Sequence, residues 1–366
     1  MSDTHLKDTT LPVSSVPAPS GPRLPTCEET AADPDASLRL GSSTEFLNGV
    51  DAPLRPLPED DYTALVRRCA RDLERLDPGG ERLVAGPSLV VALDVDGTIL
   101  DMDGRVSTRV RAAVDALRAH GAHVVIATGR GIQAAVPVAR HVGLTEGWMV
   151  CANGALTLRM DPAESAGYSI AEQVTFDPCA AIDTLREAVP DGIIAVEDLD
   201  SGFRTTRLFP EGELIERQTV VSLDDLRSRP VTRVILRAPG MPVNRFSECV
   251  ARSGLHSVEY AIGWTAWLDV APNGITKASA LDALATRLGT DAAHAIAVGD
   301  GSNDIEMLQW AGLGAVMGSA PAEVQVVGDL VTEPVWHDGC AALLDAVLLR
   351  SGVTPAIPSL PEEPHP

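Results

Sequence analysis

The sequence is poor in basic residues, with 29 Lys and Arg against 51 Asp and Glu in 366 residues and a net charge of −22. A chain this acidic has no surplus of cations to replace the counterions of a nucleic acid or to dock on anionic lipid. We therefore expect neither nucleic-acid nor membrane binding. The length predicts about two domains, at roughly 150 residues per domain, and 45% hydrophobic residues exclude a wholly disordered chain.

Long apolar segments and paired cysteines are lacking too. No run of about 18 apolar residues predicts a membrane span, and residues 1–30 have no continuous apolar stretch of the signal-peptide kind. The cysteines are too far apart to predict a zinc site or a disulfide framework, and we expect them to be reduced in a cytoplasmic protein. They are Cys27, Cys69, Cys151, Cys179, Cys249 and Cys340.

Lysine is the scarcest charged residue, because only Lys7 and Lys277 stand among the 29 basic residues and the rest are arginine. Arg is a planar fork and Lys a compact point charge, so a tight site can tell them apart. Because arginine is used at almost every basic position, the one lysine in the body of the chain indicates a position where arginine cannot replace lysine. Lys277 is therefore a candidate functional residue.

The two ends of the chain differ in composition from its middle. Residues 1–60 hold nine of the 27 prolines and show no helical or strand periodicity, which predicts a disordered tail. Residues 61–87 predict a short amphipathic helix and a linker, with Leu65 and Leu73 on one helical face. Residues 351–366 are rich in proline again and predict a second disordered tail.

Strands and helices alternate between these tails. The strands are continuous apolar runs, typical of buried parallel strands, and capping residues such as Ser107 and Thr276 begin helices between them. The pattern predicts an α/β fold with a Rossmann-like, doubly wound parallel sheet and helices on both faces. The predicted core strands are 88–95, 122–128, 148–152, 294–300 and 313–318.

A block of different order interrupts this alternation. Residues 155–268 predict a helix, two strands, a long connection, a third strand, a second helix and two final strands. We interpret this block as an α/β domain inserted into a core that consists of residues 88–154 and 269–350. The insertion point falls after the third core strand and before the helix that carries Lys277.

The sharpest chemical signal is the segment DVDGT at 94–98, directly after the first buried strand. In an open parallel sheet, ligands bind at the carboxyl ends of the strands, and Gly97 permits the sharp turn that is needed there. Asp94 and Asp96 repel each other unless a cation or a proton lies between them. Because Mg²⁺ prefers hard oxygen ligands, the segment predicts a magnesium site.

A second acidic segment, GDGSND at 299–304, also follows an apolar strand and opens a helix. Taken alone, its residues are ordinary turn and cap residues. Placed at the same sheet edge as DVDGT, Asp300 supplies a third carboxylate to the predicted magnesium site. Asn303 and Asp304 fall at the N-terminus of the following helix.

Two further features point to a bound phosphate. Thr128 and Gly129 end the second strand, where a hydroxyl and the amides of a glycine turn can hold a phosphate oxygen near a helix N-terminus. Lys277 lies in the first turn of a helix, where a cation opposes the helix dipole, so its presence indicates an anion to be balanced. A simple turn and a solvated surface lysine are the alternative interpretations.

In this order, DVDGT, a strand that ends in Thr, a lone Lys and GDGSND resemble the motifs of the haloacid dehalogenase-like (HAD) phosphohydrolase superfamily. The insert lies between the Thr and the Lys, which resembles the type II cap arrangement. Asn153-Gly154 and the stretch APNGITKASAL at 271–281 are similar to the Cof-like, type IIB branch. The resemblance covers roughly residues 88–350 and implies a HAD core with an inserted cap.

The resemblance also implies a mechanism. Asp94 would be the nucleophile that forms an aspartyl-phosphate, and Asp96 would be the general acid and then the general base. The Mg²⁺ ligands would be Asp94, Asp96 through its backbone carbonyl, and Asp300, with Asp304 among or directly behind them. The phosphoryl oxygens would be held by Thr128, Gly129, Lys277 and Asn303.

Substrate choice would lie in the insert. Arg204 and Arg207 could meet a second anionic group or a sugar, but strand alternation points them to opposite faces, so at most one lines a pocket. Surface positions are the simpler interpretation for both. Trp264 and Trp267 lie where the insert returns to the core, and we expect them in hinge packing rather than in a sugar-stacking platform.

The sequence thus predicts a cytoplasmic, Mg²⁺-dependent phosphatase of small phosphorylated metabolites such as sugar phosphates. A phosphosugar mutase of the same fold would instead return isomerised product with little free phosphate. A catalytically silent sensor of a phosphorylated ligand would show no turnover. A two-component receiver domain shares an acidic pocket and a lysine, but the spacing of the two aspartates and the large insert disfavour it. The oligomeric state is not predicted.

Overall fold

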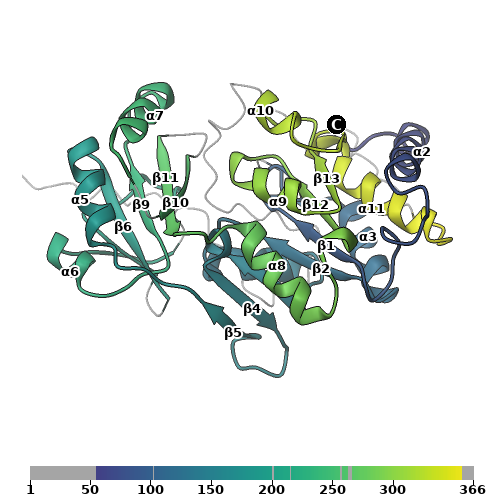
Figure 1. Ribbon diagram of the computed structural model, residues 1–366, viewed down its shortest axis with the longest axis horizontal. Helices are drawn as coiled ribbons and strands as arrows, with labels where there is room; N and C mark the ends of the chain where they lie inside the picture. Colours follow the sequence, from purple (N-terminus) through teal and green to yellow (C-terminus); the bar gives the residue numbers. More distant parts are fainter. Residues whose placement is uncertain are drawn as a thin grey trace, which may run out of the picture.

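The computed structural model has two α/β units, one built on an eight-stranded sheet and the other on a six-stranded sheet (Figure 1). It describes residues 55–101, 103–199, 202–214, 216–255, 258–262 and 266–356. Most of the two predicted tails, at 1–54 and 357–366, lies outside the described residues. In the part of the chain that is described, no helix combines the length and the apolar character needed to cross a bilayer.

The larger sheet has the strand order β14-β13-β12-β1-β2-β3-β4-β5. The strands from β14 to β3 pair in parallel, and β4 and β5 add an antiparallel edge. The order reverses at β1, so the predicted doubly wound sheet is confirmed, and ligands bind at such a reversal. The strands are β1 (Val90–Leu93), β2 (His123–Ala127), β3 (Gly147–Cys151), β4 (Leu156–Met160), β5 (Tyr168–Gln173), β12 (Ala295–Gly299), β13 (Leu313–Val316) and β14 (Leu330–Val331).

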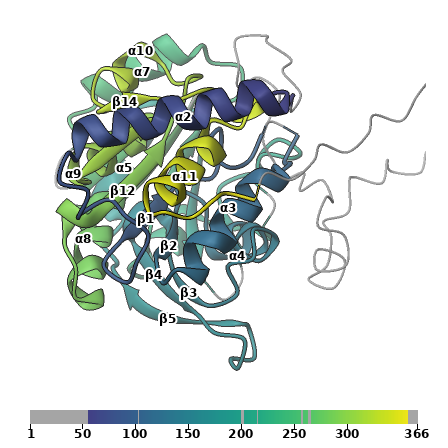
Figure 2. The same cartoon turned by 90° about the vertical axis from the view of Figure 1, so that its right-hand side faces the viewer.

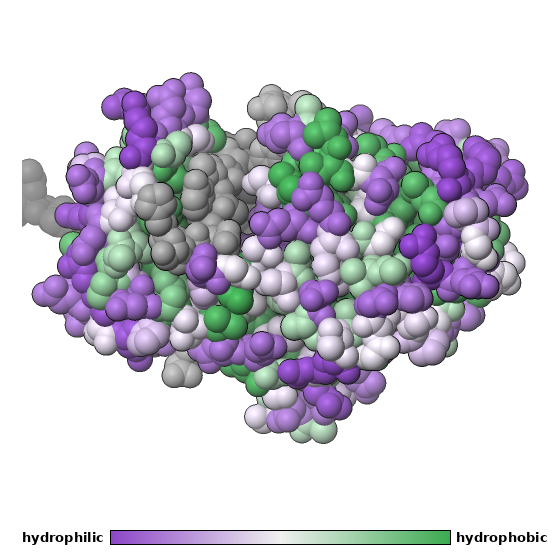
Figure 3. Space-filling model, in the orientation of Figure 1, coloured by the Kyte–Doolittle hydropathy of each residue, from purple (hydrophilic) through white to green (hydrophobic). Residues whose placement is uncertain are grey.

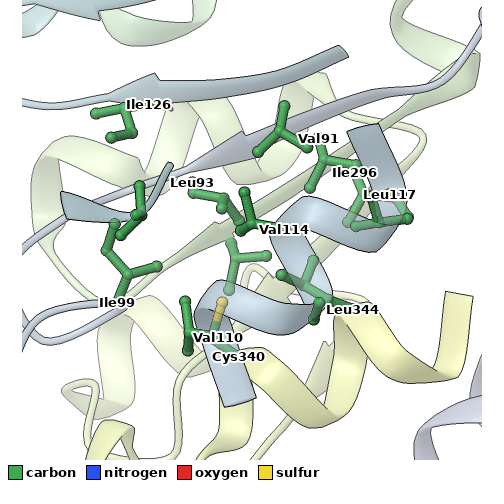
Figure 4. Close-up of a cluster of buried hydrophobic side chains, with 14 of the residues drawn as sticks. Val91, Leu93, Ile99, Val110, Val114, Leu117, Ile126, Ile296, Cys340 and Leu344 are labelled. Atoms are coloured by element: carbon green, nitrogen blue, oxygen red, sulfur yellow. The ribbon is translucent and has the colours of Figure 1, made fainter. Parts of the chain in front are cut away.

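Helices cover both faces of this sheet because alternate side chains of its buried strands point to opposite sides. Val91 and Leu93 of β1 pack in the cluster formed with α3, α4 and α11 (Figure 4). Val90 and Ala92 pack in a second cluster with α8 and α9. The helices are α3 (Thr108–Ala119), α4 (Ile132–His141), α8 (Lys277–Leu288), α9 (Ile305–Trp310), α10 (Ala322–Gln325) and α11 (Gly339–Arg350).

The predicted helix caps are confirmed at both helices for which they were proposed. Ser107 accepts a hydrogen bond from the amide of Arg109 at the start of α3. Thr276 and Ser279 form a reciprocal capping box at the start of α8, and Gly289 ends that helix in the left-handed conformation. The capping box fixes the first residue of α8, which is Lys277.

An additional helix, α2 (Glu59–Leu76), precedes the core and packs along α11 (Figure 2). It is the amphipathic helix predicted within 61–87, and Leu65 and Leu73 lie on its buried face. Its Tyr62 hydroxyl donates a hydrogen bond of 2.7 Å to the buried Asp345 of α11. The outer surfaces of α2 and α7 are hydrophilic, as expected for helices whose other faces are buried (Figure 3).

The smaller sheet has the order β10-β11-β9-β6-β7-β8, and helices α5, α6 and α7 pack on one of its faces. Ile194, Val196 and Leu236 point to those helices, where they pack with Ile182 and Phe246. The opposite face carries a separate small apolar cluster. The elements are α5 (Cys179–Ala188), β6 (Ile193–Asp198), β7 (Gly202–Thr205), β8 (Gln218–Val220), α6 (Leu223–Arg227), β9 (Val234–Arg237), α7 (Val243–Arg252), β10 (Val258–Ile262) and β11 (Trp267–Pro272).

The sheets place the insert differently from the predicted range of 155–268. Strands β4 and β5, at 156–173, extend the larger sheet, and β11 of the smaller sheet runs on to Pro272. The later start of the insert has a physical cause. The chain reverses through a single turn at Ala152–Gly154, so β4 pairs directly with β3 as an antiparallel neighbour. The residues that build the smaller unit therefore begin near α5.

Candidate active site

The predicted site segments meet at one edge of the larger sheet. Asp94 follows β1, Thr128 follows β2 and Asp300 follows β12, and these three strands are neighbours in the sheet. The ladder continues into the segments, because the Asp94 amide donates to Val298 O at 2.9 Å and the Thr128 amide to Val150 O at 2.9 Å. The side chains are therefore held by the most buried part of the core.

Three carboxylates crowd this edge. Asp94, Asp300 and Asp304 each offer an oxygen within 4.8 Å of the others. Burial, together with the charge of Asp304, raises the pKa of Asp94 to about 7, although Lys277 acts in the opposite direction. Burial and the charge of Asp94 also hold the pKa of Asp300 well above its usual range. A bound cation would relieve this repulsion.

Lys277 connects two of these carboxylates. Its ammonium donates to Asp94 Oδ1 at 2.6 Å and to Asp304 Oδ1 at 2.7 Å, and only 1% of the lysine is exposed. Burial alone would lower the pKa of Lys277, but Asp304 and Asp94 outweigh it and hold the pKa above its usual value. The cation at this helix start thus balances two carboxylates of the protein itself.

Asp304 also organises the loop that carries Asp300. Its Oδ2 accepts hydrogen bonds from the amides of Asp300, at 3.0 Å, and Gly301, at 2.9 Å. On the facing loop, Gly97 has a φ of +78°, and a Cβ there would lie 2.1 Å from Asp300 Oδ2. Only glycine therefore lets the DVDGT turn approach the Asp300 carboxylate this closely.

Asp96 lies apart from the three clustered carboxylates and is paired with Arg130. Arg130 Nε donates to Asp96 Oδ2 at 2.8 Å, and Nη2 of the same guanidinium contacts Oδ1. Partial desolvation would raise the pKa of Asp96, but the charge of Arg130 outweighs it and holds the pKa below the usual value. The Asp96 side chain keeps 41% of its surface exposed, so it can reach a bound molecule.

Thr128 and Asn303 are joined through Asn153. Thr128 Oγ1 accepts from the Arg130 amide at 3.1 Å, and the Asn153 amide donates to Thr128 O at 3.1 Å. Asn303 Nδ2 donates to Asn153 Oδ1 at 3.0 Å. A Cβ on Gly129 would lie 3.1 Å from that same Asn153 oxygen, so the glycine leaves room for the bridge.

A magnesium ion fits this set of ligands. Asp94 and Asp300 present hard carboxylate oxygens, which is the donor type that Mg²⁺ takes. Both oxygens of Asp304 are already engaged, one by Lys277 and the other by backbone amides. Asp304 therefore fits a supporting position behind the ion better than a direct one.

The face of the smaller sheet that lacks helices carries charged residues next to the Thr128 loop. Arg233 Nη1 donates to Gly129 O at 2.7 Å and lies 3.5 Å from Asp269 Oδ1. Glu197 lies on the other side of Arg233, with Oε2 3.3 Å from Nε. Local sequence patterns did not identify these residues, because Arg233 is one of many arginines and its partners come from other strands. Arg130 directly follows Thr128 and Gly129 in the sequence, but no role was predicted for it.

The arginines and tryptophans singled out in the insert lie within its own packing. Arg204 Nη1 donates to Ser228 Oγ at 3.2 Å, and Arg207 Nη2 to Asp191 O, so both are tied to the insert itself. Arg207 lies beyond the end of β7, where strand alternation no longer applies. Trp267 packs on Phe209 with ring centroids 5.3 Å apart. Trp264 lies outside the described residues.

Comparison with known proteins agrees with this arrangement. A family model described as haloacid dehalogenase-like hydrolase matches residues 91–344. The phosphoglycolate phosphatase of Halobacterium salinarum is 26% identical over 257 residues, covering 70% of this chain and 96% of the relative. The HAD phosphatase BT1666 from Bacteroides thetaiotaomicron has a TM-score of 0.60 at 25% identity, covering 73% of this chain and 96% of that one.

A second solved structure, of the HAD subclass IIB sugar phosphatase BT4131, is similar in fold with a TM-score of 0.58 at 21% identity. The alignment covers 69% of this chain and 96% of the BT4131 chain. The matched region contains all the motifs discussed above and leaves α2 outside it. The chain belongs to the haloacid dehalogenase-like hydrolase family.

Proposed function

We propose that the protein is a Mg²⁺-dependent phosphatase that hydrolyses small phosphate monoesters through an aspartyl-phosphate on Asp94. The observation that carries the proposal is the contact of Lys277 with Asp94 inside a cluster of three carboxylates. An anionic nucleophile can approach an anionic phosphate only where cations neutralise both. Lys277 is one such cation, and the three carboxylates could bind Mg²⁺ as the second.

In the first step, an oxygen of Asp94 attacks phosphorus and the ester oxygen leaves with a proton from Asp96. In the second step, Asp96 takes a proton from water, and the resulting hydroxide attacks phosphorus and frees Asp94. Both steps require at least one hydrogen bond between Arg130 and Asp96 to break, because Arg130 engages both carboxylate oxygens of Asp96. The lowered pKa of Asp96 keeps its carboxylate ionised for the second step, whereas the first step needs Asp96 protonated and therefore needs Arg130 to move away.

The magnesium ligands in this proposal are Asp94, the backbone carbonyl of Asp96 and Asp300, with Asp304 supporting them. When bound, the ion supplies positive charge and orients the phosphoryl group. Thr128 and Asn303 hold the phosphoryl oxygens together with the amide of Gly129. Their connection through Asn153 supports this role, because it holds loops from two different strands in one arrangement.

The insert supports sugar phosphates or related esters as substrates. Its face opposite the helices combines aromatic rings, including Trp267, with the carboxylates of Glu197 and Asp269, which both pair with Arg233. Carboxylates accept hydrogen bonds from hydroxyl groups and repel a second anionic group. We therefore infer a leaving group that is neutral and bears hydroxyls. The proposed location is the cytoplasm, and the five described cysteines are free thiols as a reducing compartment would keep them.

The test is phosphate release from a panel of phosphorylated sugars and p-nitrophenyl phosphate, with Mg²⁺ or with EDTA. We expect release that needs Mg²⁺, is lost in Asp94→Asn and persists in Asp103→Asn, a matched change at a partly exposed residue of the same segment. Absence of release from every ester by the folded protein would contradict the proposal. Isomerised sugar phosphate without free phosphate would identify a mutase instead.

A further inference from the structure

The loop that follows β2 has three successive carbonyls, and each receives a hydrogen bond from a different source. Thr128 O accepts from the amide of Asn153 at 3.1 Å, and Arg130 O accepts from the amide of Ala152 at 2.9 Å. Both donors belong to the core. Among the described residues, Gly129 O accepts only from Arg233, which belongs to the insert. Among the described residues, the core alone therefore gives the middle carbonyl no hydrogen-bond donor.

Contacts within the insert hold the Arg233 side chain in position. Glu197 and Asp269 flank its guanidinium at 3.3 and 3.5 Å, and the guanidinium lies over the ring of Phe203 at 5.0 Å from the centroid. The Glu197 carboxylate is held in turn by the hydroxyl of Thr232 at 2.8 Å. Arg233 is also buried, so few other positions are open to its side chain.

The core is shaped to receive this group. Gly131 ends the loop with a φ of −71°, which any residue can adopt, so its backbone does not call for glycine. A Cβ there would lie 2.4 Å from Glu197 Oε1 and 3.0 Å from Arg233 Nη2. The space beside Gly131 is thus needed by the insert rather than by the turn.

We propose that Arg233 is a positioning residue, through which the insert completes the phosphate-binding loop at 128–130. The inference rests on the proposed function, because it takes that loop as the holder of the phosphoryl group. Arg233 acts on the Gly129 carbonyl and through it on the neighbouring amides and the Thr128 hydroxyl. The loop then has its full set of hydrogen bonds only while the insert is seated on the core.

The first test compares Arg233→Met and Arg233→Lys with Arg237→Met. Arg237 is a matched control: it ends β9, which Arg233 directly precedes, and its side chain lies on the same face of the sheet. It is buried, pairs with Glu213 at 2.7 Å and donates to Ala266 O, so its hydrogen bonds lie inside the insert. We expect Arg233→Met to lower kcat/KM at least about tenfold, by a similar factor for every ester, because the loop holds the part that all esters share. Arg233→Lys should recover part of the loss, and Arg237→Met should keep activity.

The second test does not depend on turnover. Amide hydrogen exchange of the peptide that covers 128–133 should become faster in Arg233→Met and stay unchanged in Arg237→Met. Gly131→Ala tests the same contact from the core side, since its methyl group would push Glu197 and Arg233 away. It should speed exchange in the same peptide without removing any charge.

Three results would overturn the proposal. Equal loss in the Arg233 and Arg237 variants would show a general effect on the insert. A loss that differs more than about tenfold between esters would make Arg233 a substrate contact. Unchanged exchange in Arg233→Met and Gly131→Ala would show that the loop does not need the insert. If the wild-type protein releases no phosphate, the proposed function fails, while the exchange experiment still decides whether Arg233 supports the loop.

Discussion

Lys277 Nζ lies 2.6 Å from Asp94 Oδ1, although the two residues are 183 positions apart in the chain. Asp94 precedes the insert and Lys277 follows it, so their contact joins the two halves of the core across the whole inserted unit. The contact also balances the charge of the carboxylate that we propose as the nucleophile. The geometry of such a short, buried ion pair depends on whether the cation is a compact ammonium or a planar guanidinium.

Replacing Lys277 by arginine is expected to be nearly as harmful as removing the charge. The ammonium reaches both Asp94 and Asp304 within 2.7 Å in a site where the lysine is buried, and a planar guanidinium cannot take the same place. We expect Lys277→Arg and Lys277→Met both to lower kcat/KM by about 100-fold or more in phosphate-release assays. Lys277→Arg with nearly full activity would contradict the tight-site account, provided thermal unfolding shows both variants folded.

Magnesium should stabilise the protein through Asp300. Mg²⁺ at about 100 times its dissociation constant adds about 2.7 kcal/mol to the free energy of unfolding, which corresponds to a rise in Tm of about 4 °C. Asp300→Asn should abolish most of this rise. Without Mg²⁺, the variant should melt above the wild type, because it removes a repelling carboxylate. An equal Mg²⁺ shift in both proteins would place the ion elsewhere.

Stability should depend on pH through Asp345, whose pKa burial raises to about 6 despite the hydrogen bond from Tyr62. The unfolded chain has a pKa of about 3.9 at this group. The native state therefore favours the protonated form, so the stability it contributes is complete below about pH 4 and is lost as the pH rises through about 6.

Asp345→Asn removes this dependence while it keeps an acceptor for the Tyr62 hydroxyl. In urea unfolding from pH 4 to 8, the free energy of unfolding of the variant relative to that of the wild type should increase by up to about 3 kcal/mol as the pH rises. Parallel stability curves for the two proteins would show that Asp345 titrates normally.

The helix α2 should be an integral part of the core. Leu73 is fully buried in its contact with the rest of the molecule, so Leu73→Ala should lower the free energy of unfolding by about 2 to 5 kcal/mol. The same change at Leu349, which is 41% exposed on α11, should cost less than about 1 kcal/mol. Equal costs in chemical denaturation would indicate that α2 is not held on the core.

The core and its site could be predicted because their signals are local. The five predicted strands of the parallel sheet are continuous apolar runs, whereas the two-residue β14 was not predicted. The residues directly after β1, β2 and β12 meet for a topological reason. Asp94, Thr128 and Asp300 could therefore be placed at one edge before any contact was known. The lone lysine and its capping residue Thr276 located the helix that closes the site.

The remainder depends on contacts between segments that carry no local signal. The predicted insert of 155–268 includes the residues of β4 and β5, but no strand was predicted there, because nothing local in the sequence marks an antiparallel edge of the core. Arg233 is oriented by Glu197 and Asp269 from two other strands and reaches a carbonyl of the other unit. The pairing of Asp96 with Arg130 likewise appears only when two loops are side by side.

The most direct test of the account is a search for the phosphoryl group on Asp94. The wild-type protein, Asp96→Asn and Asp94→Asn are mixed with a phosphate ester and Mg²⁺, quenched rapidly in acid and mapped by peptide mass spectrometry. We expect one added phosphoryl group on the peptide that contains Asp94, more of it in Asp96→Asn because hydrolysis of the intermediate is slowed, and none in Asp94→Asn. Phosphate release by the wild type with no phosphorylated peptide, together with an active Asp94→Asn variant, would contradict the account.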